Sequence, residues 1–303
     1  MKLNRKIKNN LFNNMIEKVQ FKPIKQNNIL VQETPKNNIF LQEIPKNKYF
    51  WENENEPTIW ISMIIPSYNT KKEYLISCIN SIKEQVGNFG LELVWINDCS
   101  SDTNTEILVN LLETILKPLK NYKLVYIKMD INNGISSCLY NGVNLSSNEI
   151  IFRMDSDDIM KNSRIQKQLD FIMSNPLCVM CGTNITSFEE INGIKNIISN
   201  STHKNCLTWE EYKKNPIDWV LNHPTLCFRK TAILNIGNYK ENFKFPFEDL
   251  DLELRVLKKY GVIYNINECL IFYRIHNNQV TKQTTYNENK IIKKLLIKKI
   301  ISS

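Results

Sequence analysis

The stretch IWISMIIPSYN, residues 59–69, decides the fold. Its first eight residues form a nearly continuous apolar run that ends at Pro66. Runs of this kind are typical of strands that are buried on both faces of a parallel sheet. Apolar residues at helical spacing follow between positions 75 and 82, so this part of the chain predicts a strand and then a helix.

Strands and helices alternate in the same way as far as residue 154. The expected strands are 59–66, 91–98, 123–129 and 148–154, and the expected helices are 75–82, 103–116 and 135–145. This order predicts an α/β fold with a central, mostly parallel sheet flanked by helices. Such sheets bind ligands at the carboxyl ends of their strands, where the polar segments 66–69, 97–100 and 155–158 are expected to meet.

The pattern is more mixed after residue 175. Strands are expected near 177–186, 262–265 and 270–274, and helices near 208–215 and 247–260. We interpret these elements as the second half of the same domain.

Composition and charge divide the chain into three parts. Residues 1–56, rich in Asn and Lys and carrying the repeat NNILVQETPK then NNIFLQEIPK, predict a weakly ordered arm. Residues 57–280 are expected to form the domain, and residues 281–303 a basic helix or tail. The formal net charge of +8 divides into +4, −1 and +5 over these parts. The near-neutral domain has no basic stripe, which weighs against nucleic-acid binding.

The cysteines and the apolar runs indicate a compartment. Eight cysteines are spread through apolar segments, as expected of buried free thiols in a reducing environment. The pair Cys178 and Cys181 lies in an expected strand and is more typical of a core than of a metal site. No apolar segment follows the start MKLNRKIKNN, and no apolar run approaches 18 residues. We therefore expect no signal peptide, no transmembrane helix and cytoplasmic residence.

The segment RMDSDDIM, residues 153–160, follows the fourth expected strand and carries Asp155, Asp157 and Asp158. Clustered carboxylates repel one another unless solvent or a cation compensates them. One interpretation is an acidic surface turn. The other is a metal site, because a D-x-D turn can aim two carboxylates at Mg²⁺ or Mn²⁺ and leave room for diphosphate oxygens.

A second acidic cluster lies in FPFEDLDLELR, residues 245–255. On a helix, Asp249 is turned by about 100° from Glu248. One interpretation is an acidic first turn, favoured by the helix dipole, with a surface pair of Asp251 and Arg255. The other makes one carboxylate a general base for an incoming hydroxyl group. The residues alone favour neither interpretation.

Seven segments occur in a characteristic order, while the usual NTPase, dinucleotide and hydrolase motifs are absent. The segments are IIPSYN, WINDCSSDTNTEIL, NNGISSCLYNG, IIFRMDSDD, NHPTLCFRKTAI, FEDLDLELR and FYRIH. This series resembles the family 2 glycosyltransferases, which are nucleotide-sugar-dependent enzymes of the GT-A fold. The resemblance covers about residues 60–280 and implies a Rossmann-like central sheet.

The resemblance also implies site residues. The residues expected to contact the nucleotide sugar are Pro66, Tyr68, Asn69, Asp98, Asp155 and Ser156. The residues expected to hold the metal are Asp155, Asp157, Asp158 and His276, a histidine found near the diphosphate in some members. Glu248 and Asp249 would supply the general base, and Asp249 is the position that we favour.

The resemblance implies an inverting reaction. The base deprotonates an acceptor hydroxyl group, which attacks the anomeric carbon while a divalent metal stabilises the leaving nucleoside diphosphate. For this chain we therefore expect a hexosyltransferase that uses a UDP-sugar and Mn²⁺ or Mg²⁺. The acceptor would be a glycan, a protein or a lipid-linked sugar.

Three residues depart from the family pattern. Asn97 stands in place of the first of two adjacent aspartates. Leu139 stands where many members carry Arg, and Tyr140 where they usually carry Asn. These two changes weaken the expectation that this segment contacts the donor diphosphate, but they leave the metal and base candidates in place.

Two other functions are compatible with the same core. A non-catalytic nucleotide-sugar or glycan-binding module would not need Asp98, Asp155, Asp157 and Asp249 together. A sugar-nucleotide pyrophosphorylase would carry a glycine-rich, arginine-containing loop after the first strand, and PSYNTKKEY has neither feature. We therefore favour the transferase.

The segment KIIKKLLIKKIISS, residues 290–303, alternates apolar and basic pairs. It could lie on an anionic membrane surface as a peripheral contact, which would suit a lipid-linked acceptor. It could also form a terminal helix that packs on the domain with its lysines outward. We favour the second interpretation, because the apolar face is not continuous.

Overall fold

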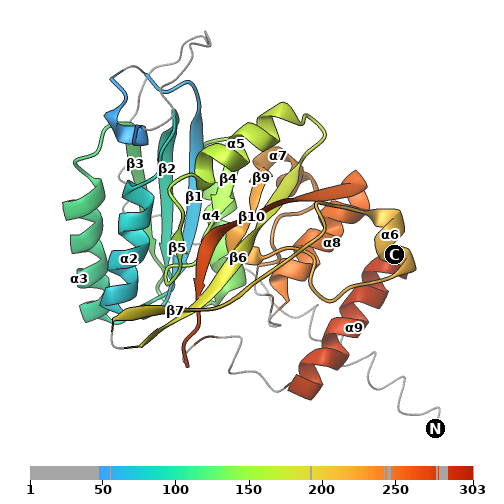
Figure 1. Cartoon of the computed structure of the whole chain (residues 1–303). Helices are drawn as coiled ribbons and strands as arrows, with labels where there is room; N and C mark the ends of the chain where they lie inside the picture. Colours follow the sequence, from blue (N-terminus) through green and yellow to red (C-terminus); the bar gives the residue numbers. More distant parts are fainter. Residues whose placement is uncertain are drawn as a thin grey trace. The chain divides into compact units, whose positions relative to one another are not determined.

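The first half of the sheet is parallel, as the sequence predicts (Figure 1). A computed structural model describes residues 48–54, 56–191, 193–241, 243, 247–277, 279 and 286–302, so most of the expected N-terminal arm lies outside the described residues. The first four strands are β1 (Trp60–Ser67), β2 (Gly90–Asn97), β3 (Tyr122–Lys128) and β4 (Ile150–Arg153). They lie in the order β3-β2-β1-β4 and are parallel.

The other half of the ten-stranded sheet is mixed, in the order β4-β9-β6-β10-β5. Its strands are β5 (Ile159–Met160), β6 (Met180–Ile191), β7 (Ile194–Asn200), β8 (Cys206–Thr208), β9 (Cys227–Arg229) and β10 (Val262–Arg274). Strand β9 is antiparallel to β4 and β6, whereas β6 and β10 are parallel to each other. Strands β7 and β8 pair with β6 and β10. These pairings join both halves into one α/β sheet.

The prediction of two strands over 262–274 was wrong, because β10 is one strand. Its register against β6 shifts between Ile266 and Cys269 and again between Cys269 and Ile271. Such irregularities leave extra residues out of the ladder, and here Asn267 and Glu268 are exposed. The interruption in the apolar pattern is therefore a bulge within a continuous strand.

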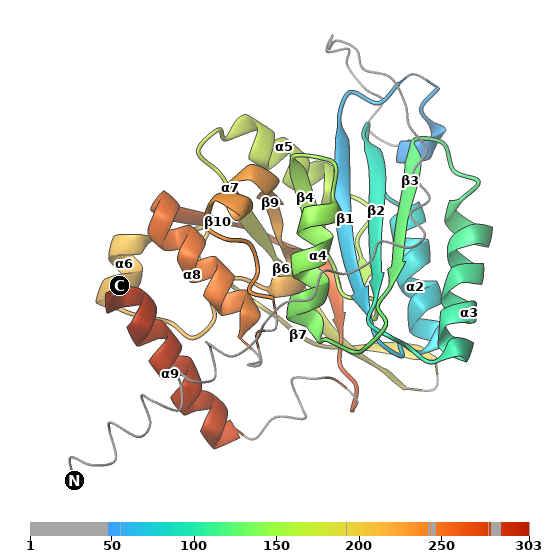
Figure 2. The same ribbon diagram turned by 180° about the vertical axis from the view of Figure 1, so that it is seen from behind.

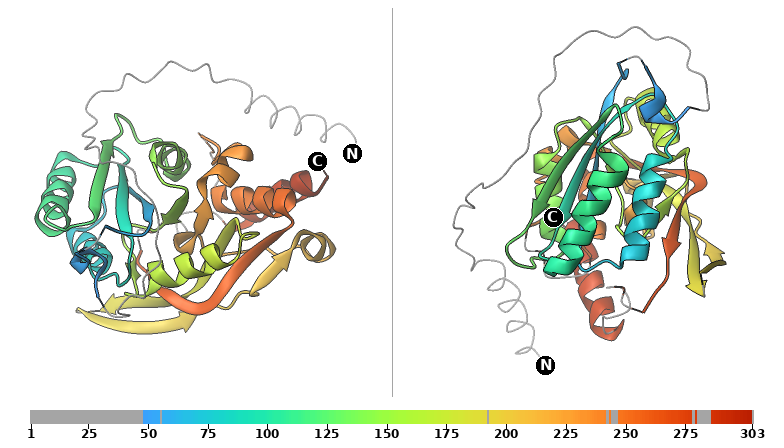
Figure 3. Two further views of the ribbon diagram at one scale, coloured as in Figure 1. Left: turned by 90° about the horizontal axis from the view of Figure 1, so that it is seen from above. Right: turned by 90° about the vertical axis from the view of Figure 1, so that its left-hand side faces the viewer.

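Helices cover both faces of the sheet. The main helices are α2 (Lys72–Lys83), α3 (Asp102–Leu111), α4 (Ile135–Leu145), α5 (Arg164–Ser174), α6 (Trp209–Lys214), α7 (Lys230–Asn235), α8 (Glu248–Tyr260) and α9 (Tyr286–Ser302). Short helical turns are η1 (Phe50–Glu52), η2 (Leu112–Leu116) and η3 (His223–Thr225). Helices α2, α3 and α5 pack in one hydrophobic core, and α4, α6, α7, α8 and α9 in the other. Figure 2 shows α4 and α8 from their side, and Figure 3 shows α2 and α3 on theirs.

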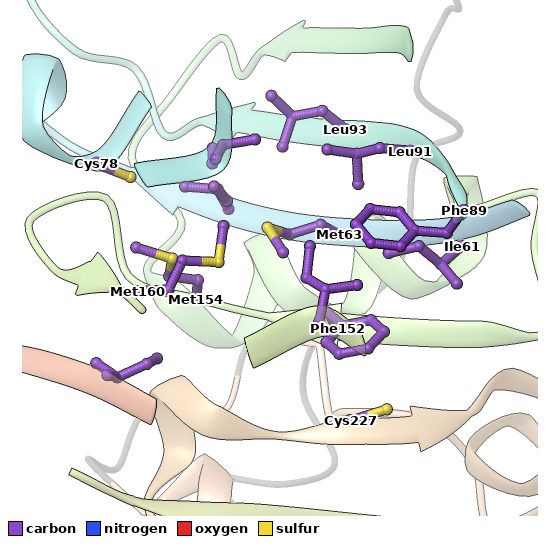
Figure 4. Packing of buried hydrophobic residues seen from close by; sticks show 14 of the residues in the cluster. Ile61, Met63, Cys78, Phe89, Leu91, Leu93, Phe152, Met154, Met160 and Cys227 are labelled. Carbon is purple, nitrogen blue, oxygen red and sulfur yellow. The ribbon is translucent and has the colours of Figure 1, made fainter. Parts of the chain in front are cut away.

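Alternate residues of the central strands enter the two cores. Met63 and Leu93 lie in the first core with Ile61 and Leu91, as Figure 4 shows. Ile64, which lies between Met63 and Ile65 in the sequence, packs in the second core. Each fully buried side chain of this size contributes about 1.5–3 kcal/mol. Burial on both faces is therefore the reason for the continuous apolar runs.

Helix α4 lies very close to β1. A Cβ atom on Gly142 would lie 2.5 Å from Cγ2 of Ile64, so only glycine fits at this contact without movement. At the start of α4, Gly134 has φ +82°. The loop at this start takes part in the site described below.

The remaining expectations concern cysteines and the C-terminal segment. All eight cysteines are free thiols, and Cys178 and Cys181 are buried. Leu296, Ile297 and Ile300 of α9 pack in the second core, while Ile291 and Leu295 stay exposed. Among the described residues, no helix is both long and apolar enough to cross a membrane.

Candidate active site

The ends of β1, β2 and β4 bring three polar segments together. Ser67 at the end of β1 lies opposite Asn97 of β2, and its carbonyl oxygen accepts a hydrogen bond from the Asp98 backbone N–H at 2.8 Å. The hydroxyl groups of Thr70 and Ser156 lie 2.7 Å apart, which joins the segment after β1 to the segment after β4. The expected rim of polar residues is thus formed by contacts between three loops.

The segment after β1 serves mainly to hold the neighbouring loop. Pro66 is buried within β1, whereas Tyr68 is 54% exposed. Asn69 has φ +47°, a left-handed conformation that asparagine tolerates. Its Oδ1 accepts hydrogen bonds from the Ser101 backbone N–H at 2.9 Å and from Nδ2 of Asn104 at 3.2 Å. Tyr68 therefore offers an exposed side chain to the nucleotide-sugar donor, whereas Oδ1 of Asn69 is already used by these hydrogen bonds.

Asn97 is a structural residue in its buried position. Its Nδ2 donates to the Tyr126 hydroxyl at 2.9 Å and to Thr105 Oγ1 at 3.2 Å. Its Oδ1 accepts from the Ser100 backbone N–H at 2.9 Å. Asn97, in place of the aspartate of the family pattern, therefore supplies a buried amide donor, and no hydrogen-bond partner at the rim is lost.

Asp98 binds the loop that precedes α4. Its two carboxylate oxygens accept the backbone N–H groups of Asn133, at 2.9 Å, and Gly134, at 2.8 Å. Leu139, further along α4, is fully buried, and Tyr140 packs against the second core. These two departures from the family pattern thus point into the core. Asp98 lies at the rim, and its contact with a nucleotide remains a prediction.

The three aspartates after β4 form a compact group. One carboxylate oxygen of each of Asp155, Asp157 and Asp158 lies within 4.8 Å of the others. Arg153 holds Asp155 with a forked contact, in which the two guanidinium nitrogens lie 2.5 and 2.8 Å from its carboxylate oxygens. Burial raises the pKa of Asp155, and the Arg153 charge opposes that increase. The cluster is therefore not a solvated surface turn.

The end of strand β10 and the residues after it supply the partners of the other two aspartates. His276 Nε2 lies 2.8 Å from Asp157 Oδ2, and the Arg274 backbone N–H donates to Asp158 Oδ1 at 2.9 Å. The Arg274 side chain donates to the Asp157 carbonyl oxygen and pairs with Glu190. Sequence reasoning missed Arg274. Its burial is known only from the structure, and a buried charged residue rarely lacks a role.

The three aspartates have the chemistry of a site for a hard divalent cation. Carboxylate oxygens are the ligands that Mg²⁺ and Mn²⁺ prefer. Asp158 Oδ2 is buried and has no hydrogen-bond partner, and burial raises the pKa of this carboxyl group well above its usual range. A cation would compensate the oxygen that the protein leaves without a donor. Asp155, Asp157 and Asp158 thus fit a metal, whereas His276 lies against Asp157 and is not part of this compact group.

Glu248 and Asp249 begin α8 with little compensation from cations. Burial, helped by the Asp249 charge, raises the pKa of Glu248 to about 8, and burial also raises the pKa of Asp249. The nearest basic side chain to Glu248 is His223, with Nδ1 at 3.7 Å from Oε1. Burial keeps the pKa of His223 well below its usual value, so this ring is neutral at pH 7. Glu248 and Asp249 therefore stay protonated to a higher pH than exposed carboxyl groups do.

The pair of Asp251 and Arg255 is not the surface pair that the sequence suggested. Asp251 is buried and contacts both Arg255, at 2.8 Å, and Lys240. The side of α8 that carries Asp251 faces the segment around residue 240, which the helical periodicity could not indicate. This pair anchors α8 and stands apart from the metal and base candidates.

Arg153 connects the two acidic clusters. Its charge lowers the pKa of Asp155, Glu248 and Asp249, and the carboxylates of Asp155 and Glu248 in turn favour its charged form. Its side chain is only 1% exposed. Sequence reasoning did not single out Arg153, although an arginine that ends an otherwise apolar strand is a usable signal.

Comparison with known proteins agrees with this geometry. The family model described as glycosyl transferase family 2 matches residues 62–234. The amylovoran biosynthesis glycosyltransferase AmsE of Erwinia amylovora is 26% identical over 227 residues, which are 75% of this chain and 80% of that protein. The UDP-Gal:alpha-D-GlcNAc-diphosphoundecaprenol beta-1,3-galactosyltransferase of Escherichia coli is 30% identical over 146 residues, 48% of this chain and 51% of that one.

Solved structures show the same fold. The structure of residues 1–349 of TarS from S. aureus in complex with UDP-GlcNAc superposes with a TM-score of 0.60 at 18% identity. The match covers 78% of this chain and 65% of that one, so this chain spans just under two thirds of the TarS fragment. The family model covers more than half of the chain, and the chain therefore belongs to glycosyl transferase family 2 and is a glycosyltransferase of the GT-A fold.

Proposed function

We propose that this chain is an inverting hexosyltransferase that moves a sugar from a UDP-sugar to a hydroxyl group of a glycan, protein or lipid-linked acceptor. The observation that carries the proposal is the electrostatic interaction between the two acidic clusters. Asp249 raises the pKa of Asp155, and Asp155 raises the pKa of Glu248. Groups that shift one another in this way lie in one site, which can serve both the leaving group and the proton.

The donor would bind over the carboxyl ends of β1, β2 and β4. The proposed contacts are Pro66, Tyr68, Asn69, Asp98, Asp155 and Ser156. The UDP-GlcNAc in the TarS complex and the UDP-Gal in the name of the Escherichia coli enzyme support a UDP-sugar. The exposed Tyr68 ring is well placed to pack against a nucleotide, since aromatic side chains at such surfaces offer an apolar face.

Asp155, Asp157 and Asp158 would hold Mn²⁺ or Mg²⁺. A divalent ion bound there would neutralise the charge that develops on the departing diphosphate. The residues of the chain keep the cluster in position. His276 orients Asp157, the Arg274 backbone N–H orients Asp158, and Arg153 fixes both oxygens of Asp155.

Asp249 is the proposed general base. As the acceptor oxygen bonds to the anomeric carbon and the bond to the diphosphate breaks, the hydroxyl proton passes to the Asp249 carboxylate. Burial raises the pKa of Asp249, which makes it a stronger proton acceptor than an exposed aspartate. Glu248, with its pKa near 8, is largely protonated at pH 7, so Asp249 is the acceptor of the pair.

Contact of residues 290–303 with a membrane is a secondary proposal. Ile291 and Leu295 are exposed on α9, and Lys294 and Lys298 lie beside them on the exposed side. Anionic lipid attracts basic helices of this type. Co-sedimentation with vesicles of phosphatidylglycerol is expected to fall when Lys294 and Lys298 are both replaced by Glu. Unchanged co-sedimentation would contradict the contact without affecting the proposed reaction.

The proposed reaction is tested on the full chain with UDP-glucose, UDP-galactose and UDP-N-acetylglucosamine in Mn²⁺, Mg²⁺ or EDTA. With metal, we expect UDP to be released from at least one donor, and with EDTA we expect no release. Calorimetric UDP binding should depend on the metal in the same way. Anomeric proton couplings of the product should show inversion. Absence of UDP binding in every metal condition, or retention of configuration, would contradict the proposal.

A further inference from the structure

A separate pocket lies on the side of the sheet that carries α6. Its volume is about 690 Å³, which is within the range of sites for small molecules. It is lined by the returning segment 199–204, by α6 and by the segment 217–222 that leads to η3. None of the residues that we assign to the donor, the metal or the base lines it. The pocket is therefore distinct from the proposed donor, metal and base positions.

Trp219 gives the pocket an exposed aromatic wall. Its side chain is 61% exposed, and it is the one exposed tryptophan among the five, all of which lie in the described part of the chain. The His203 ring lies beside it, with 6.4 Å between the ring centroids and 58° between the planes. Large exposed aromatic side chains in a pocket are typical of binding surfaces, since they offer apolar area with few degrees of freedom.

Polar groups surround this aromatic wall. Asn200, Ser201, Asp218 and Asn215 line the pocket and supply both donors and acceptors. The face of a pyranose ring that carries C–H bonds packs on aromatic rings, while its hydroxyl groups require such donors and acceptors. An aromatic wall among short polar side chains therefore matches a saccharide better than a purely apolar ligand.

The charges of the lining select the kind of saccharide. Lys204 pairs with Glu211 at 3.5 Å, which leaves Asp218 without a balancing cation in the lining. Burial lowers the pKa of His203, so its ring is neutral at pH 7. The lining thus carries an excess negative charge and disfavours a uronic acid or a phosphorylated sugar.

The pocket lies near the proposed base. Trp219 is four residues before His223, whose Nδ1 is 3.7 Å from Glu248 Oε1. Four residues of extended chain span at most about 14 Å, so the wall of the pocket is within reach of the reaction centre. The Leu221 backbone N–H also donates to Glu253 of α8 at 3.3 Å, which fixes this segment to the helix that begins with Glu248 and Asp249.

We propose that this pocket binds a neutral saccharide of the acceptor, with Trp219 as its stacking platform and Asp218 as a hydrogen-bonding residue that rejects anionic sugars. The proposal rests on the proposed transferase function for the word acceptor. It assigns to the segment 217–222 the task of presenting the acceptor to the proposed base.

Binding is tested with the methyl glycosides of glucose, galactose and N-acetylglucosamine, the corresponding disaccharides, and methyl glucuronide. The readouts are saturation-transfer NMR and quenching of tryptophan fluorescence, which reports mainly on Trp219 because the other tryptophans are less exposed. We expect at least one neutral saccharide to bind and to protect Trp219 from an external quencher. Trp219→Ala should weaken that binding at least tenfold, whereas methyl glucuronide should bind more weakly than its neutral counterpart.

Two further variants complete the test. Leu177→Ala removes another highly exposed apolar side chain that lies outside the pocket and should leave saccharide binding unchanged. Asp218→Asn should keep neutral saccharide binding within about threefold and reduce the discrimination against methyl glucuronide. UDP binding in Mn²⁺ is measured on every variant and should equal that of the wild-type protein.

The outcomes separate the pocket from the reaction. Intact UDP binding with no saccharide effect at Trp219, or equal effects of Trp219→Ala and Leu177→Ala, would overturn the pocket proposal and leave the transferase proposal standing. Saccharide binding at Trp219 without any UDP binding would overturn the donor assignment and leave a saccharide site.

Discussion

The two acidic clusters of the site differ in the way their charge is compensated. In the group after β4, Asp155 is held by Arg153 and Asp157 by His276, and Asp158 accepts a backbone N–H. At the start of α8, the basic side chain that the described residues place within 4 Å of Glu248 is the neutral His223, and Arg153 acts on Glu248 only through its charge. The group after β4 is thus held by direct hydrogen bonds and ion pairs, although the pKa values of Asp155 and Asp158 are raised like those of Glu248 and Asp249.

The difference lies in the direct partners of the carboxylates. Both clusters are largely shielded from solvent, and burial is the main cause that raises the pKa of every member with a resolved shift. Direct partners oppose this increase, because an ion pair or a hydrogen bond favours the charged form and a neutral neighbour does not. Four substitutions test this difference, beginning with the one that should reduce activity most.

Asp157→Ala should have the largest effect. It removes a proposed metal ligand and the partner of His276, so we expect transfer to fall by at least about 10³-fold and metal-dependent UDP binding to be lost. Enzymatic UDP release and calorimetric UDP titration in Mn²⁺ provide the two measurements. Normal UDP binding in this variant would break the assignment of the first cluster to the donor.

Asp249→Asn should lower kcat by about 10²- to 10⁴-fold and leave UDP binding intact. A general base acts in its ionised form, and the raised pKa of Asp249 means that the wild-type rate should increase with pH. The variant should lose that increase. Glu248→Gln is the matched control: it keeps Asp249 and replaces a carboxyl group that is largely protonated at pH 7, so the increase of the rate with pH should persist. Near wild-type turnover of Asp249→Asn would exclude Asp249 as the base.

Arg153→Gln should change the pKa of carboxyl groups in both clusters. It removes the charge that lowers the pKa of Asp155, Glu248 and Asp249, so the pH at which activity increases should move upward. Breaking a buried ion pair should also reduce the free energy of unfolding by about 3–5 kcal/mol. The measurements are a pH–rate profile and urea unfolding.

Arg153→Lys provides the control for charge. It keeps the positive charge but loses the forked contact with Asp155, so the pH–rate profile should stay near that of the wild-type protein while kcat decreases. An unchanged profile in Arg153→Gln would show that Arg153 is a structural residue only.

Glu253→Gln should have the smallest effect and concerns stability. Glu253 lies one turn after Asp249 on α8, is buried, and has a pKa raised well above its usual value, mainly by burial. A carboxyl group with a raised pKa in the folded state stabilises the fold at low pH and loses that contribution as pH increases toward the folded-state pKa. The variant should therefore match the wild-type protein near pH 4 and be more stable at pH 8, by about 1 kcal/mol. Urea unfolding at both pH values measures this, and equal differences would contradict it.

Much of the fold follows from local patterns. The strands β1 to β4 and the helices α2, α3, α4, α6 and α8 begin and end within a few residues of the expected positions. Apolar runs and helical spacing act over short distances in the chain, so they are visible without a structure. The strands β5, β7, β8 and β9 and the helices α5 and α7 were not expected; of these, β5, β8 and β9 have only two or three residues and carry no periodicity.

The candidate site was predictable in its residue types and not in its contacts. The D-x-D segment and the Glu248–Asp249 pair stand out in the sequence as clustered charge. The role of Arg274 did not, since it depends on β10 ending beside a turn that lies more than a hundred residues earlier. The same holds for Asn97, Leu139 and Tyr140, whose departures from the family pattern are explained by partners inside the molecule.

The sequence by itself determined the alternation of strands and helices, the two acidic clusters and the family. It took the tertiary structure to show that Arg153 links those clusters, that Asp98 binds the loop before α4, and that Trp219 lines a pocket. The physical reason is that burial and hydrogen-bond partners, which set pKa and accessibility, come from residues far away in the chain.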